Sequence, residues 1–265
     1  MWLGATALRA GPTEDAIIDL MRLGEQSSYT WVMTISDDAR TYDIDGKTDR
    51  AGYSRVTMPM INVVRRRLGR DVTDNRVEAI FVSNAACVLR TPLGWLRPDK
   101  LPEPDSLSDY ERLGATSAVP IGKKRRTILT APGGAGPKEP RSYSNLQLAI
   151  SPPHEELAVI VSSHQEFKVD GEVVSGTLTE VGAALLLVRD GQPHITPLNA
   201  SGDFKVWLRG RLPIRYQTNL KGTLAIASEK GEVKIAVQQR TFATIRDIGT
   251  TVVEVPEEAK IALAQ

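Results

Sequence analysis

The sequence has little of what enzymes and disulfide-stabilised proteins use. It contains one cysteine, Cys87, so an intrachain disulfide is excluded, and its 265 residues suffice to bury a core without one. Its three histidines, His154, His164 and His194, lack metal-ligand spacing such as H-E-x-x-H. No serine lies in a G-x-S-x-G or S-x-x-K motif. The sequence therefore predicts neither an enzyme nor a bound metal or cofactor.

Charge of one sign is not in excess, since 33 basic residues face 32 acidic ones. No overall field draws the chain to nucleic acid, and no aromatic residues alternate with its basic clusters as a base-stacking platform would require. We expect these clusters to be either solvated loops or contacts for anionic membrane headgroups or an acidic partner protein. They comprise Arg65, Arg66, Arg67 and Arg70, and Lys123, Lys124, Arg125 and Arg126.

Long hydrophobic runs are also missing, so no segment of about 18 apolar residues predicts a membrane-spanning helix. Residues 1–10 are nonetheless small and apolar, and Ala5, Thr6 and Ala7 form an A-x-A pattern. We expect residues 1–12 to be either the end of a secretory signal whose basic start is missing or a disordered N-terminus. The first alternative predicts a periplasmic or secreted protein.

Strand patterns fill most of the rest of the chain. Hairpin follows hairpin, with helices expected at about 13–24, 153–164 and 180–188 and a short one after Pro256. Residues 98–144, rich in proline, glycine and basic residues, predict an irregular insertion within one domain over 13–265. This order of elements predicts an α+β fold, with one large curved antiparallel sheet, an open half-barrel, and helices on its concave face.

The stretch "DFKVWLRGRLPIRYQTNLKGTLAI", residues 203–226, predicts a short strand, a turn and a very long strand that starts at Pro213. Alternation places Ile214, Tyr216 and Leu220 on one face of the long strand and polar residues on the other. Gly222 is a natural position for the sheet to bend. Residues 28–36 alternate in the same way. The apolar set expected on the concave face is Trp31, Met33, Ile35, Phe204, Val206, Leu208, Tyr216, Leu220 and Leu224.

Several motifs resemble the lipoprotein-carrier superfamily of LolA, LolB and LppX, and uncharacterised secreted proteins of that class. They are "YTW" at 29–31, "GKT" at 46–48 before "GY" at 52–53, "TPLGW" at 91–95, "GRLPIRY" at 210–216 and "DIGTTVVEVPEEA" at 247–259. The resemblance implies a half-barrel with helices in its concavity and a location in the cell envelope. The basic run after residue 64 and the absence of a lipobox cysteine depart from the family pattern.

Two functions remain open from the sequence. If the helices leave room, the concave face is a pocket for an apolar ligand, such as a lipid or the acyl chain of a lipoprotein. If they fill it, the protein is a structural or partner-binding envelope protein that acts through its basic loops or a sheet edge.

Overall fold

The structure is a computed structural model, which describes residues 12–26, 28–37, 41–59, 76–82, 86–101, 151–188, 195–228 and 231–264. Both predicted basic clusters, His194 and most of the predicted insertion lie outside these residues.

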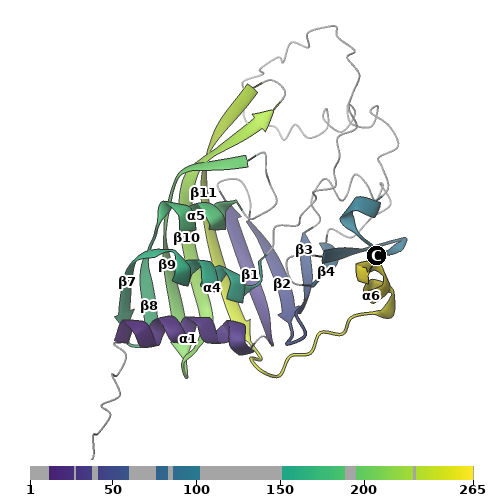
Figure 1. Cartoon of the computed structure of the whole chain (residues 1–265), viewed down its shortest axis with the longest axis horizontal. Coiled ribbons are helices and arrows are strands. Elements are labelled where there is room, and N and C mark those ends of the chain that lie inside the picture. Colours follow the sequence, from purple (N-terminus) through teal and green to yellow (C-terminus); the bar gives the residue numbers. More distant parts are fainter. Residues whose placement is uncertain are drawn as a thin grey trace, which may run out of the picture.

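A single open antiparallel sheet of eleven strands organises the described chain, in the order β6-β5-β4-β3-β2-β1-β11-β10-β9-β8-β7. The predicted fold class is thus confirmed. The sheet consists of two meanders, β1–β6 and β7–β11, which meet where β1 pairs with β11 (Figure 1). The strands are β1 (Tyr29–Asp37), β2 (Thr41–Thr48), β3 (Tyr53–Pro59), β4 (Arg76–Val82), β5 (Ala86–Thr91), β6 (Gly94–Leu96), β7 (His164–Asp170), β8 (Val173–Leu178), β9 (Ile195–Arg209), β10 (Leu212–Ser228) and β11 (Gly231–Arg246).

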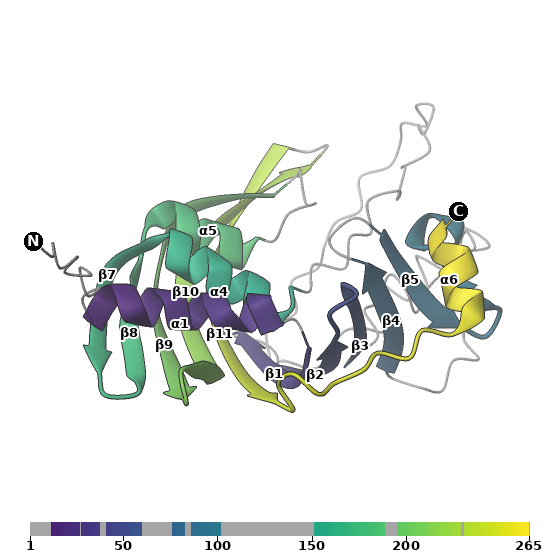
Figure 2. The ribbon, with the colours of Figure 1, turned by 60° about the horizontal axis from the view of Figure 1, so that its bottom comes forward.

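Three helices lie on the concave face, over the β7–β11 half of the sheet and β1 (Figures 1 and 2). They are α1 (Pro12–Gln26), α4 (Pro153–Ser162) and α5 (Glu180–Leu187). Helix α1 buries Ala16, Leu20 and Leu23 at helical spacing and leaves Ile18 and Met21 exposed on its other side. No helix within the described ranges combines the length and hydropathy needed to cross a bilayer.

The alternation of β1 sets the face that forms the core. Tyr29, Trp31, Met33 and Ile35 are all buried, as predicted, whereas Val32 on the opposite face is 41% exposed. Trp31 pairs across the ladder with Gly46 of β2, and a Cβ added at Gly46 would lie 2.0 Å from the indole Cε2. The glycine therefore makes the space in which the largest buried side chain lies.

The last helix, α6 (Glu257–Ala264), lies on the outer face of the sheet. Ala79 and Leu89 of β4 and β5 join the main core, but their sequence neighbours Ile80 and Val88 point the other way and pack with Ala259 of α6. The segment before α6 runs from the end of β11 past the ends of β1–β3 (Figure 2), where the Gly249 N–H donates to the Ser28 carbonyl at 2.6 Å. Helix α6 thereby packs against the β4–β6 end of the sheet.

Three local expectations were wrong. The predicted short strand is the end of β9, which has 15 residues. Ile214 was expected on the concave face of β10. The ladder between β9 and β10 shifts between Pro213 and Arg215, and Pro213 instead pairs with Leu208 on the concave side. The helix expected to reach His164 ends at Ser162, which places His164 at the start of β7.

Candidate functional site

Most of the predicted concave-face set lies under the three helices. Its members other than Leu224 have exposed fractions between 0% and 8% and belong to one hydrophobic cluster with side chains of α1, α4 and α5. In this part of the half-barrel the protein's own helices fill the concavity.

Helix α4 is held on the sheet by two tyrosines as well as by apolar packing. The Tyr216 hydroxyl donates to Glu156 Oε2 at 2.7 Å, and this glutamate is only 2% exposed. The Tyr29 hydroxyl lies 2.6 Å from His154 Nδ1 and accepts from the His154 backbone N–H at 3.3 Å. Burial raises the pKa of Tyr29 and lowers that of His154, so both groups are neutral at pH 7. These bonds fix the start of α4 to β1 and β10.

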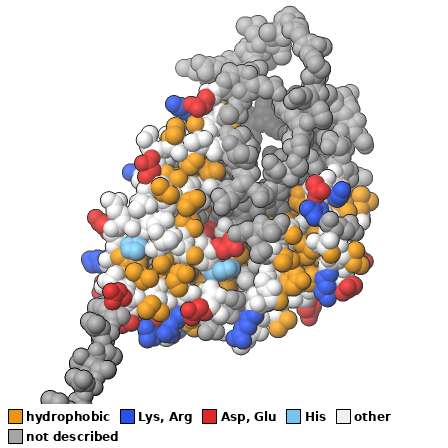
Figure 3. Space-filling model, in the orientation of Figure 1, with side chains coloured by type: hydrophobic (Ala, Val, Ile, Leu, Met, Phe, Trp, Pro, Cys, Tyr) orange, Lys and Arg blue, Asp and Glu red, His pale blue; other side chains and the backbone are white. Residues whose placement is uncertain are grey.

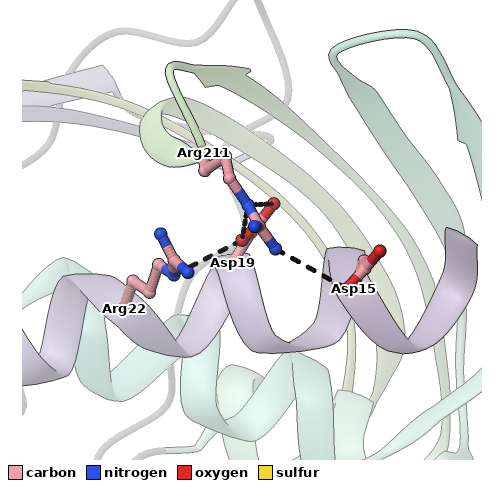
Figure 4. Close-up of polar contacts among 4 residues, drawn as sticks. All are labelled: Asp15, Asp19, Arg22 and Arg211. Carbon is pink, nitrogen blue, oxygen red and sulfur yellow. Dashed lines mark hydrogen bonds and ion pairs between the residues drawn. The ribbon is translucent and has the colours of Figure 1, made fainter. Parts of the chain in front are cut away.

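Helix α1 is fastened by charge to the turn between β9 and β10 (Figure 4). Arg211, which has a positive φ of 67°, places its Nε 2.9 Å from Asp19 Oδ1 and 3.2 Å from Oδ2. Its terminal nitrogen lies 3.6 Å from Asp15, and Arg22 lies 3.4 Å from Asp19. Asp19 is mostly buried, so solvent screens its pair with Arg211 less than a surface pair.

The concave face continues beyond the helices along the far ends of β9, β10 and β11. Gly222 marks the limit, because a Cβ there would meet Leu187 of α5 at 3.1 Å. The ladder shifts at this point, where the extra residue belongs to β9 and Asn199 has a positive φ of 50°. The bend predicted at Gly222 therefore coincides with an irregularity in the neighbouring strand.

Beyond this bend an apolar surface, here called the arm patch, is open to solvent. Leu224 pairs with Ile235 and Ile226 pairs with Val233, so these four side chains share the concave side. Val233 is 50% and Ile235 is 45% exposed, and the adjoining α5 exposes 42% of Leu185. Figure 3 shows hydrophobic side chains along this side of the molecule, from the helices toward the hairpin tip. The arm patch consists of Ile195, Pro197, Leu224, Ile226, Val233 and Ile235.

Sequence reasoning placed Leu224 in the site but missed Val233 and Ile235. The signal was present, since "EVKIAV" at 232–237 alternates like the strands under the helices. The alternation does not show how far α5 extends. This helix ends at Leu187 and leaves Val233 and Ile235 uncovered.

Among the described residues, no group of three or more His, Cys, Asp and Glu side chains is placed to hold a metal ion. Cys87 on β5 packs against the main core, and burial raises the pKa of its thiol to about 12. The thiol therefore stays protonated near neutral pH and is a poor nucleophile.

No family model matches the chain, and no similar sequence was found among curated proteins. Among solved structures, MucB in complex with MucA(peri) matches 93% of this chain and 60% of its own, at 12% identity and a TM-score of 0.32. A MucA/MucB complex from Pseudomonas aeruginosa matches 94% and 62% at 13% identity and a TM-score of 0.31. A DUF1329 family protein from Desulfovibrio piger matches 91% and 95% at 11% identity and a TM-score of 0.24.

The chain thus spans about 60% of the MucB structure, and at these TM-scores the likenesses bear no weight for its function. The lipoprotein-carrier resemblance remains a prediction from the sequence motifs.

Proposed function

We propose that this chain is a non-catalytic binding protein of the cell envelope, and that its arm patch binds the acyl chain of a lipid or of a lipid-modified protein. One observation supports this most directly. The apolar face that is core under the helices continues into side chains that are partly exposed on β9 and β10 and about half exposed on β11. The envelope location rests on the family resemblance.

An acyl chain suits this surface because the arm patch consists of apolar side chains on the adjacent strands β9, β10 and β11. Hydrophobic stabilisation is about 25 cal/mol per Å² of apolar surface removed from water. An acyl chain gains about 0.8 kcal/mol for each methylene that it buries. The helices fill their part of the concavity, so the acyl chain would bind beside them without displacing them.

The test is binding of a dansylated fatty acid, followed by its fluorescence, to wild-type protein and to Val233→Asp and Ile235→Asp. Both side chains are exposed, so a charge there is compatible with folding. We expect each variant to weaken binding about tenfold or more, since full burial of a Val or Ile side chain contributes about 1.5–3 kcal/mol. Val252→Asp is the matched control, because Val252 is 73% exposed on the segment before α6.

The proposal is wrong if wild-type protein does not bind the probe, or if the two arm variants bind it as tightly as Val252→Asp. Native mass spectrometry of gently purified protein gives an independent check, since a bound lipid adds mass that organic extraction removes.

The burial of the eight residues under the helices favours a second candidate function. A protein with a filled concavity is suited to binding an envelope partner protein at a sheet edge. The terminal strand β7 is such an edge. A clean apo mass after incubation with mixed envelope lipids would favour this function over the first.

A further inference from the structure

The outer face of the sheet carries an open groove of about 510 Å³ that crosses β11, β1, β2 and β3. It lies on the opposite side of the sheet from α1, α4, α5 and the arm patch. Its lining includes Thr30, Val32, Lys47, Arg55, Arg246 and Asp247.

Basic residues form one row across this groove. The strand register pairs Thr30 of β1 with Arg246 of β11 on one side and with Lys47 of β2 on the other. Lys47 in turn pairs with Arg55 of β3. Like charges directly opposite one another destabilise a sheet. Three of these four adjacent positions therefore carry cations, of which Arg55 is ion-paired with Glu78.

Three acidic residues line the groove, and two of them form ion pairs. Glu78 forms ion pairs with Arg55 and with Arg90, and Asp45 pairs with Arg76. Asp247 Oδ2 accepts a hydrogen bond from the Thr30 hydroxyl at 2.7 Å.

The cations on either side of Thr30 form no direct ion pair with the third acidic residue, Asp247. Within the described part of the chain, the side chains of Lys47 and Arg246 make neither an ion pair nor a hydrogen bond. Neighbouring strands lie about 4.8 Å apart, so these two long side chains can reach over Thr30 toward one anion.

The groove also offers an apolar contact. Val32 lies two residues after Thr30 on the same face of β1, is 41% exposed and lines the groove. The volume exceeds what one inorganic ion fills, so there is room for an organic group beside the anion.

We infer that this groove binds a phosphate-bearing organic anion. Lys47 and Arg246 would contact the phosphate oxygens from both sides of Thr30, and the organic part would lie over Val32. A phosphate suits this arrangement better than a carboxylate, because its additional oxygens can contact two cations at once. The same chemistry is found in soluble phosphate esters and in phospholipid headgroups. This inference does not depend on the arm patch.

Calorimetric titration of the whole chain at low salt, with phenyl phosphate and with inorganic phosphate, tests the inference. We expect phenyl phosphate to bind more tightly because of its contact with Val32. Lys47→Gln and Arg246→Gln should each weaken binding about tenfold, the usual effect of losing one charge-assisted hydrogen bond. Lys47→Arg should retain binding. The matched control is Lys221→Gln, which removes an exposed cation from the outer face of β10 outside this groove.

Two arms distinguish the sources of phosphate. Binding of phenyl phosphate without flotation on phosphatidylglycerol vesicles would identify a site for soluble esters. Flotation that requires Lys47 and Arg246 would identify a headgroup site. The inference is overturned if the protein binds neither phenyl phosphate nor phosphatidylglycerol vesicles. It is also overturned if Lys47→Gln and Arg246→Gln bind as tightly as Lys221→Gln.

Discussion

Replacing Gly46 by alanine should destabilise the protein strongly, although it adds only one methyl group. The added Cβ would lie 2.0 Å from Cε2 and 2.2 Å from Cζ2 of Trp31, whereas ordinary contact begins near 3.4 Å. The indole must therefore move by more than an ångström inside a packed core, which typically costs about 1–3 kcal/mol. The movement also weakens the 3.3 Å hydrogen bond from Trp31 Nε1 to Thr48 Oγ1. Such a bond contributes about 0.5–1.5 kcal/mol to the free energy of unfolding.

We therefore expect Gly46→Ala to lower the free energy of unfolding by about 2–4 kcal/mol. Urea unfolding followed by far-UV circular dichroism measures this without relying on tryptophan fluorescence. Gly24→Ala on α1 is the control with opposite sign. A Cβ there meets nothing within 4 Å, so better helix propensity should raise stability by about 0.5–1 kcal/mol.

A double-mutant cycle isolates the contact between the two side chains. Trp31→Leu removes all three indole atoms nearest to the new methyl group. In that background Gly46→Ala should cost less than about 0.5 kcal/mol, because the two residues are coupled through direct contact. A full cost in the Trp31→Leu background, or no cost in the wild type, would refute the proposed packing.

Two further predictions concern the attachment of α4. Burial lowers the pKa of His154 in the folded state, so the unfolded chain binds more protons and stability should fall as the pH drops below about 6.5. Urea midpoints across this range should show the fall in wild-type protein and less of it in His154→Gln; equal profiles would contradict the assignment. Tyr216→Phe should cost about 1.5–3 kcal/mol, because it removes the hydroxyl that donates a hydrogen bond to the buried Glu156. Tyr53→Phe, which alters a half-buried tyrosine beside α6, should change stability by less than about 0.5 kcal/mol in the same denaturation assay.

Period-two alternation made the architecture readable from the sequence. In β1 every second residue is buried, and the same pattern identified the core positions of β9 and β10. The pattern fails where the ladder shifts. The residues around Ile214 and Asn199 follow the backbone of the neighbouring strand, which a single strand's sequence does not encode.

The candidate sites were less predictable for a related reason. Alternation distinguishes the two faces of a strand, but exposure depends on where the covering helices end. Leu220 and Leu224 have the same character in sequence, yet one is core and the other lies in the arm patch. Likewise, Lys47 and Arg246 lie almost 200 residues apart, and only the pairing of β1 with both β2 and β11 brings them into one groove.

The strand order has a consequence for how the chain can fold. The partner of β1 on its open side is β11, whose first residue, Gly231, lies far along the chain from Asp37, the last residue of β1. At synthesis rates of about 5–20 residues per second, the edge of β1 would wait roughly 10–40 seconds for its partner. During that time the first meander presents an unpaired edge to any other strand, and α6 has yet to cover its outer face. Completion of the fold therefore depends on β11 and α6, and a chain truncated before Gly231 would retain an unpaired strand edge at β1.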